Sequence, residues 1–519
     1  MSERTSVPVQ FHSILYERPD DSPKREDFGV PDFFHDLNLD QIIDSITAGW
    51  KEYDLTSFFY APLHDLGEIA YRQEVMRDLE EKIVMQFVKT FSEQMRVMRR
   101  YLIQAKKLSY KYEKERWFLS TILIYCEGVV GFLQNLNQAI LKSRGMRAFR
   151  EYLAAYVESA SFVALMAQAR MLESELSTIR YCLLIKDSTI TVRNYEDEID
   201  LGAAVDETFE KFKQGAVKDY RAKFQSGAGM NHVEAQVLEQ VARLNPDIFR
   251  ALDTFCAEQS NYLDFKVAAF DREIHFYVAY LDFVEGFEPV GLAFCYPRLS
   301  DTSKEIKGLQ TFDLSLACKL VSEKVEVICN DFFMRGVERI FVVSGPNQGG
   351  KTTFARTFGQ LHYLAALGCP VPGAEAQLFL FDRLFVHFEK EEEIENLRGK
   401  LEDDLVRIRR ILDQATPRSI VIMNEIFTST ALMDAINLSK KIMTRISQLD
   451  LLCVCVTFLD ELASFDVKTV SLVSMVDPNN VVTRTFKVER RPADGLSYAL
   501  AIAEKYQLTY NALTDRIKI

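Results

Sequence analysis

Several features that mark secreted, fibrous or membrane-embedded proteins are missing from this sequence. The 14 prolines and 22 glycines among 519 residues are too few for long disordered linkers. The first residues, Met1-Ser-Glu-Arg-Thr5, lack the apolar core of a signal peptide, and no apolar run approaches the ~18 residues that a membrane span needs. We therefore expect a cytoplasmic protein of two or three domains.

Cysteines with metal-ligand spacing are missing as well. The nine cysteines are scattered, and the closest pair, Cys453 and Cys455, lies in an apolar run where residues two apart share a strand face. We interpret this pair as buried thiols, because Cys behaves as a small hydrophobe. Redox or metal chemistry is the alternative.

Positive charge is in deficit, since 62 Lys and Arg face 75 Asp and Glu and the net charge is −13. A DNA site would therefore have to be a local basic patch. One candidate stretch, whose alternative is a solvated helical face, contains Arg96, Arg99, Arg100, Lys106, Lys107, Lys111, Lys114 and Arg116. A second stretch, for which both interpretations stay open, contains Lys211, Lys213, Lys218, Arg221 and Lys223. Neither has the residues of a helix that reads the major groove.

The apolar pattern divides the chain near residue 300. Helical spacing dominates the first part, over Glu68–Ser109, Phe118–Leu141, Met146–Ile179 and His232–Phe283. Helices this long indicate a lever or arm, and a β-hairpin over residues 181–193 would form its tip. We expect an N-terminal leader (1–36), a helical core or lever domain (37–300) with a clamp-like insertion at about 180–230, and a C-terminal domain (301–519).

The C-terminal part has the rhythm of a parallel α/β sheet. Short apolar runs separated by helical patterns cover Ile340–Ser344, Leu378–Phe388, Ile420–Met423 and Leu451–Thr457. Residues 481–488 alternate after a turn and predict an added antiparallel strand, and the tail over 497–519 is helical in pattern.

A phosphate-binding motif begins directly after the first of these runs. Gly345-x4-Gly350-Lys351-Thr352 fits G-x-x-x-x-G-K-[ST] between a strand and a helix, and a chance glycine turn beside a lysine is the alternative. Glycines let backbone N–H groups face phosphate oxygens, Lys351 would reach the β/γ-phosphates, and the Thr352 hydroxyl would ligate Mg²⁺. The predicted ATP contacts are Gly345, Pro346, Asn347, Gln348, Gly349, Gly350, Lys351, Thr352 and Thr353.

A second part of such a site is an apolar strand that ends in polar residues. Ile420-Val-Ile-Met-Asn424-Glu425 supplies it. Glu425 is placed to orient or activate the attacking water, and Asn424 to hold the water shell of the metal. An ordinary solvated glutamate at a strand end is the alternative for Glu425. The acidic run Glu389–Glu395 we interpret as a solvated face and not as a metal site.

These residues resemble the MutS family of DNA mismatch-repair ATPases, within the ABC-type superfamily. The resemblance rests on Ser344–Thr352, Ala365–Pro372, Phe381–Phe385, Met423–Ile426 with Asp434, Thr457–Leu462 and Asp494–Ala501, and more diffusely on Pro62–Asp65 with Tyr71–Gln73. It implies an α/β P-loop (ABC-type) ATPase domain C-terminal to a long all-α lever or core domain with a small β-containing clamp tip. The hairpin would correspond to the clamp region that touches the DNA backbone.

Two departures from the family concern recognition and chemistry. The core-like pattern starts near Leu37, and Phe33–Asp36 is not the family's Phe-x-Glu wedge, so we expect no direct mispair readout. In the site, Asn424 stands where the family has an Asp, and Phe458 stands where it has a His that senses the phosphate. Gly399 stands where the family has the serine that a partner subunit presents. We expect ATP binding to survive and hydrolysis to be slow.

The resemblance implies a homodimer with composite ATPase sites, using ATP and Mg²⁺ to change the geometry of its arms. Its ligand would be DNA, held by backbone and shape as a nucleotide-driven clamp or switch in repair or recombination. The alternative is a catalytically weak nucleotide-binding scaffold that grips a protein partner. A small-molecule kinase is disfavoured, because it gives the lever region no role.

Overall fold

The computed structural model describes residues 11–19, 29–187, 189–196, 229–389, 399–477, 480–493 and 508–517. The chain forms two compact units, each described here by itself. The first contains residues 81–141 and 147–271, and the second contains residues 11–80, 142–146 and 272–519. These units do not follow the expected boundary near residue 300, because residues 11–80 pack with the C-terminal part.

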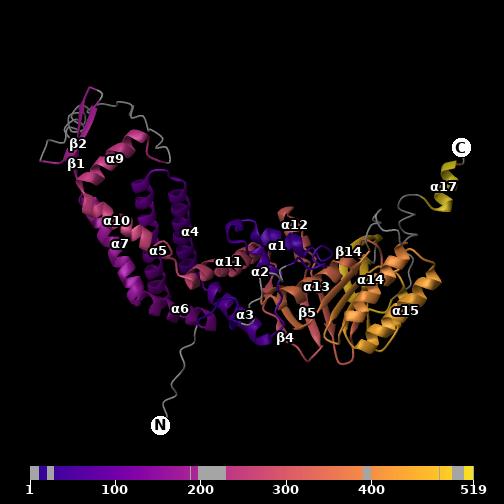
Figure 1. Cartoon of the computed structure of the whole chain (residues 1–519). Helices are drawn as coiled ribbons and strands as arrows, with labels where there is room; N and C mark the ends of the chain where they lie inside the picture. Colours follow the sequence, from indigo (N-terminus) through magenta and orange to yellow (C-terminus); the bar gives the residue numbers. More distant parts are fainter. Residues whose placement is uncertain are drawn as a thin grey trace, which may run out of the picture. The chain divides into compact units, whose positions relative to one another are not determined.

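The first unit is helical and carries one β-hairpin (Figure 1). The hairpin strands β1 (Tyr181–Lys186) and β2 (Thr189–Asn194) pair antiparallel, which confirms the predicted hairpin. The long helical stretches are interrupted where local signals favour it: Ser159 caps a new helix through the N–H of Phe162, and Pro246 begins another. The helices are α4 (Lys82–Lys107), α5 (Lys111–Gln138), α7 (Ala160–Thr178), α9 (His232–Leu244) and α10 (Pro246–Glu258). Two more helices are shared with the second unit: α6 (Arg144–Val157) begins there, and α11 (Phe265–Glu285) continues into it from residue 272.

Helix α5 corrects the expectation that no apolar stretch is long enough to cross a membrane. Among the described residues it is the one helix long and apolar enough to cross a membrane, with a mean hydropathy of 1.4 over 18 residues. Half of that window is buried inside the protein, which is typical of a core helix.

The second unit contains a six-stranded sheet in the order β10-β11-β12-β7-β13-β14 (Figure 1). Its first five strands are parallel and β14 is antiparallel. The predictions of the strands at 340–344, 420–423, 451–457 and 481–488 are confirmed, whereas the strand at 469–477 was not predicted. The strands are β7 (Ile340–Ser344), β10 (Leu384–Phe388), β11 (Ile420–Asn424), β12 (Leu452–Val456), β13 (Thr469–Asp477) and β14 (Asn480–Arg490). The longer helices of this part are α13 (Lys351–Ala366), α14 (Lys400–Gln414) and α15 (Leu432–Leu449).

The prediction of one strand over Leu378–Phe388 is wrong. The chain leaves a smaller sheet after β9 (Glu375–Phe379), and the N–H groups of Leu380 and Asp382 donate to the carbonyls of Ser300 and Arg418 before β10 begins in the larger sheet. The smaller sheet also contains β4 (Arg298–Ser300), β5 (Ile306–Thr311) and β6 (Asn330–Met334). A separate two-stranded sheet pairs β3 (Phe294–Cys295) with β8 (Val371–Pro372).

Residues 11–80 join this unit through buried polar contacts. Arg72 is fully buried, and its guanidinium donates to the carbonyls of Leu15 and Leu367. The Tyr71 hydroxyl donates to the Ser13 carbonyl. The remaining elements of the unit are α1 (Leu39–Thr47), η3 (Lys51–Tyr53), α2 (Thr56–Phe59), α3 (Leu66–Glu80), η4 (Glu288–Val290), α12 (Leu314–Ser322), η5 (Asp460–Ser464) and α17 (Tyr510–Ile517).

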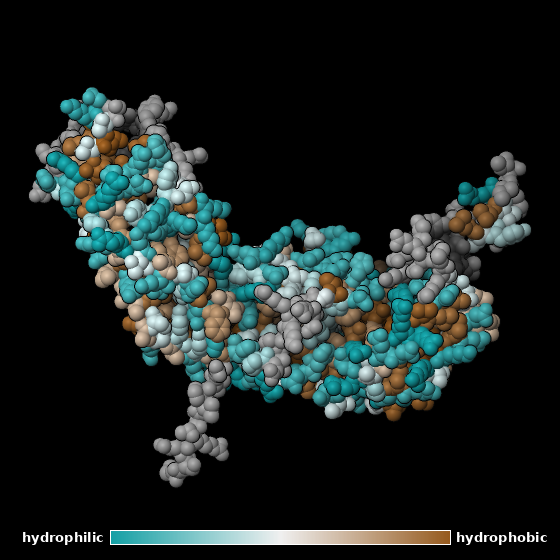
Figure 2. All heavy atoms as spheres, in the orientation of Figure 1, coloured by the Kyte–Doolittle hydropathy of each residue, from teal (hydrophilic) through white to brown (hydrophobic). Residues whose placement is uncertain are grey.

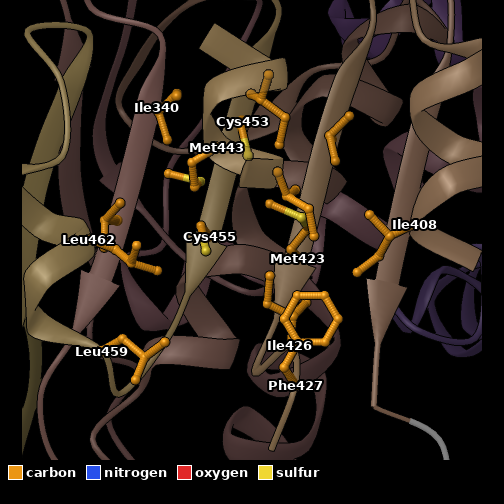
Figure 3. Packing of buried hydrophobic residues seen from close by; sticks show 14 of the residues in the cluster. Ile340, Ile408, Met423, Ile426, Phe427, Met443, Cys453, Cys455, Leu459 and Leu462 are labelled. Carbon is orange, nitrogen blue, oxygen red and sulfur yellow. The ribbon is translucent and has the colours of Figure 1, made fainter. Parts of the chain in front are cut away.

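One face of the larger sheet packs against α15 in an apolar core (Figure 3). Cys453 and Cys455 point into it beside Met423, Met443 and Ile340, and all five are buried. The interpretation of the two cysteines as buried thiols is confirmed. Burial raises the pKa of Cys455 to about 12, which removes it from thiolate chemistry.

Asp450 ties together the N-terminal ends of three adjacent strands. Its carboxylate accepts hydrogen bonds from Lys468 (2.7 Å) and Lys304 (3.1 Å) and lies 3.2 Å from Arg339. Burial alone would raise the pKa of Asp450, but the hydrogen bonds from Lys468 and Lys304 outweigh it and lower the pKa from 3.8 to about 2.

Replacing Asp450 with Asn should therefore destabilise the second unit in a pH-dependent way. Because the folded pKa lies below the unfolded value, the stabilisation is complete above about pH 4 and is lost as the pH falls towards 2. The carboxyl group is partly exposed, so we expect a loss of only about 1 kcal/mol at pH 7. Thermal melts should show a lower Tm for the variant at pH 7 and a difference in Tm that shrinks as the pH falls from 4 to 2. A difference that keeps its full size at pH 2 would contradict the ion-pair explanation.

Candidate nucleotide-binding site

A glycine loop (residues 345–350) connects β7 to α13. Its backbone takes positive φ values at Gly345 (112°), Gln348 (58°) and Gly350 (97°), which a Cβ atom makes costly. Ser474 of β13 crowds the loop and donates its hydroxyl to the Gly349 carbonyl at 2.7 Å. A Cβ on Gly349 would lie 2.0 Å from the Ser474 Oγ, so this position requires glycine.

Lys351 begins α13 and turns its side chain back into the glycine loop. The ammonium donates to the carbonyls of Gly345 (2.9 Å) and Pro346 (3.1 Å) and to the Asn347 Oδ1 (3.2 Å). Only 4% of the residue is exposed. Burial lowers the pKa of Lys351 and Glu425 opposes this shift. A cation enclosed by loop oxygens is suited to exchange them for phosphate oxygens.

Thr352 and Asn424 meet at the edge of the sheet. The Thr352 hydroxyl, in the first turn of α13, donates to the Oδ1 of Asn424 at the end of β11 over 3.1 Å. Hydroxyl and amide oxygens suit Mg²⁺, which prefers oxygen ligands and keeps several waters. These two residues would hold the ion, and its charge would neutralise phosphate oxygens.

Glu425 lies immediately beyond that pair. Its backbone has φ 56°, and its N–H donates to the Val456 carbonyl at 2.9 Å, so the chain bends sharply here. Burial raises the pKa of Glu425, Lys351 opposes this shift and Glu389 adds to it. The alternative from the sequence was an ordinary solvated glutamate at a strand end. The Glu425 carboxylate is instead half-buried beside the glycine loop.

Glu389, the described member of the acidic run, is exposed, in agreement with the solvated face that we expected. It pairs with Lys400 in the first turn of α14 and accepts a hydrogen bond from the Thr428 hydroxyl at 2.8 Å. The remainder of that run, residues 391–395, lies outside the described residues, as do Asp494–Ala501. Gly399, at the start of α14, has open space where a Cβ would be.

Two aromatic residues near the loop have roles that the sequence did not reveal. The Phe458 ring lies 4.6 Å from the Lys351 ammonium, a cation–π contact in place of a hydrogen bond. Phe486 on β14 has φ 58° and is 49% exposed, and its backbone lies within 3.5–3.9 Å of the Cβ position of Gly350. The alternating pattern predicted the strand but carried no signal for its position against the loop.

Comparison with known proteins agrees with this geometry. Residues 341–516, which include the glycine loop, the end of β11 and β14, match the model of MutS domain V. By this match, residues 341–516 are similar to domain V of the MutS family. The helical part of the chain precedes these residues, as the resemblance implied.

Several proteins similar to this chain carry the name DNA mismatch repair protein MutS. The protein of Orientia tsutsugamushi (strain Ikeda) is 31% identical over 192 residues, which cover 36% of this chain and 22% of the relative. That of Halalkalibacterium halodurans is 27% identical over 253 residues, 46% of this chain and 28% of the relative. That of Petrotoga mobilis is 27% identical over 203 residues, which cover 39% of this chain and 23% of the relative. The chain thus spans under a third of the length of these relatives.

The first basic stretch is partly paired with carboxylates. Five of its eight cations pair with carboxylates: Arg96 and Arg100 with Glu93, Arg99 with Asp271, Lys111 with Asp253, and Arg116 with Glu173. This arrangement favours the structural alternative over phosphate contact. The second basic stretch lies outside the described residues.

Proposed function

We propose that this protein is an ATP-binding, MutS-like switch with slow, Mg²⁺-dependent hydrolysis. The single observation that supports it most is the buried Lys351 ammonium, held by oxygens of a loop whose backbone favours glycine at positions 345, 349 and 350. The loop amides and Lys351 would bind the phosphates, and Thr352 with Asn424 would hold the metal. Glu425 would orient the attacking water and accept its proton.

Slow hydrolysis follows from what the site lacks. Asn424 brings no charge to the metal, and the Phe458 ring cannot hydrogen-bond a phosphate or a water. Charge-assisted hydrogen bonds contribute roughly 1 kcal/mol more than neutral ones, which corresponds to about fivefold to tenfold in Mg²⁺ affinity.

Restoring the charge gives a direct prediction. The Asn424→Asp variant should lower the Mg²⁺ concentration for half-maximal ATP hydrolysis by about fivefold to tenfold, because an oxygen still accepts from Thr352. Turnover measured across a magnesium titration checks this. Asn437→Asp, which adds the same charge at an exposed position of α15, is the matched control. An equal shift in both variants would contradict a metal role for residue 424.

Phe486 is suited to stack on the base of the nucleotide. Its carbonyl accepts from the Asn330 side chain at 3.2 Å, which fixes the strand beside the loop while the ring stays exposed. Base–aromatic stacking contributes about 1–3 kcal/mol, so Phe486→Ala should weaken ATP binding by about fivefold or more. Phe486→Tyr should restore the affinity. Tripolyphosphate, which has no base, should bind both variants and the wild type equally, and a loss there would contradict stacking.

We further propose that two copies close on each other around the ATP sites. Leu432 and Met433, at the start of α15 beyond the Glu425 loop, are each 65% exposed, and such apolar exposure is typical of a covered surface. Closure driven by ATP would change the geometry of the helical arms and their hold on DNA. Because coupling is reciprocal, a ligand of the arms would alter ATP affinity in return.

A gel-shift panel of duplex, branched and single-stranded DNA, with and without ATP, tests this function. Binding that appears or disappears with ATP and weakens with salt would support it. Sedimentation of the same samples would report whether ATP favours a dimer. DNA binding that is identical with and without ATP would contradict the switch.

One observation favours a second function, a scaffold that grips a protein partner. Tyr181, Leu183, Ile185 and Ile190 of the hairpin are each between 41% and 73% exposed, and an apolar patch covers this hairpin (Figure 2). Apolar side chains suit a protein surface better than a phosphate backbone. Absence of DNA binding in the panel, together with hydrolysis that does not depend on Glu425, would favour this function.

A further inference from the structure

A pocket of about 920 Å³ opens in the first compact unit, and no residue of the glycine loop lines it. It lies where the end of α4 and the start of α5 face the end of α10 and the residues that follow it. Leu102, Phe118, Tyr262 and Leu263 form apolar walls, and Leu263 is 38% exposed. This volume is within the range of small-molecule sites.

One of the two carboxyl groups at this pocket is already paired. The Asp253 Oδ2 accepts a hydrogen bond from Lys111 at 2.6 Å. Burial raises the pKa of Glu115 to about 7, and Asp253 adds to this shift, so Glu115 is partly protonated near neutral pH. Lys111 therefore balances the charge of Asp253, and Glu115 brings less than one negative charge.

Two further lysines leave the pocket positively charged. Lys106, in the last turn of α4, and Lys114, in the first turn of α5, both line it. Within the described part of the chain, neither has a carboxylate within 4 Å. An excess of positive charge beside apolar walls stands out on a chain whose net charge is −13.

The one cysteine that lines the described pocket is a poor nucleophile. The Cys256 thiol lies against the Glu115 carbonyl, and burial raises the pKa of Cys256 to about 12. A protonated thiol reacts slowly. These features favour binding over covalent chemistry.

We propose that this pocket binds a small molecule that joins an apolar, aromatic or acyl body to one anionic group. The body lies against Leu102, Phe118 and Leu263, and the anion pairs with Lys106 and Lys114. A cationic ligand would have to displace Lys111 from Asp253 and would face two further ammonium groups.

Fluorescence titration of the full chain tests the proposal with 8-anilinonaphthalene-1-sulfonate as the probe. N-Phenyl-1-naphthylamine has the same aromatic body without the sulfonate and measures the contribution of the charge. Saturating MgATP is present throughout, so that the nucleotide site does not take up the probe. Dodecanoate and 2-naphthoate, added as competitors, distinguish acyl from aromatic bodies.

The sulfonate should bind with one saturable site and about tenfold or more tighter than the neutral analogue. The double variant Lys106→Ala/Lys114→Ala should lose that tenfold preference, and Ala257→Trp, which fills the mouth of the pocket from an exposed position, should abolish binding of both probes. Lys107→Ala is the matched control, because Lys107 neighbours Lys106 without lining the pocket. Equal losses in the control, equal binding of the two probes, or unchanged binding in Ala257→Trp would overturn the proposal.

Discussion

Lys351→Ala is expected to abolish measurable ATP binding. The ammonium now holds three oxygens of the glycine loop within 3.2 Å, and these are the contacts that phosphate oxygens would replace. Hydrogen bonds to a charged group contribute about 1.5–3 kcal/mol each, so the loss of two lowers affinity on the order of 10²–10⁴-fold. Isothermal titration with ATP and Mg²⁺ measures this directly.

Controls separate the loss of charge from damage to the loop. Lys351→Met keeps most of the buried volume without the ammonium and should bind ATP as poorly as the alanine variant. Lys441→Ala removes an exposed lysine from α15 and should bind like the wild type. Thermal melts without nucleotide should show that all three variants fold. Unchanged affinity in the folded Lys351→Met variant would overturn the placement of the phosphates.

The glycine loop could be located from the sequence because its signals are local. Gly345 and Gly350 take backbone angles that favour glycine, and Lys351 begins the helix that follows the loop. The strand before the loop and the helix after it can both be recognised from nearby residues. The parallel strands β7, β11 and β12 were equally accessible, since each is a short buried run, whereas β13 was not predicted. The antiparallel β14 was found through its alternating pattern and the turn before it.

Features that depend on distant contacts could not be predicted in this way. The apolar run from Leu378 to Phe388 hides a change of sheet, which depends on hydrogen bonds to Ser300 and Arg418. Residues 11–80 belong to the C-terminal unit because Arg72 donates a hydrogen bond to the carbonyl of Leu367, which is remote in sequence. The Tyr71 hydroxyl likewise donates to the carbonyl of Ser13, which precedes it in the chain. Phe486 reaches the glycine loop only through the pairing of β13 with β14.

Glu425→Gln is expected to lower single-turnover ATP hydrolysis by about 10²–10⁴-fold, the usual contribution of a general base. The substitution keeps the size of the side chain and its bent backbone but removes the group that accepts a proton from water. ATP affinity should change by less than about threefold, because the loop and Lys351 carry the binding. Rapid-quench measurement with enzyme in excess over ATP gives the rate of the chemical step.

This variant also decides between the two proposed functions. Glu461→Gln, an exposed glutamate of η5, is the matched control and should hydrolyse ATP like the wild type. If the wild type is no faster than Glu425→Gln while it still binds ATP, the nucleotide acts as a structural ligand and the scaffold function is favoured. If it is faster by the expected factor, Asn424 and Phe458 slow a working site without disabling it. The rate ratio therefore carries more information than the absolute rate, which a missing partner or DNA would also lower.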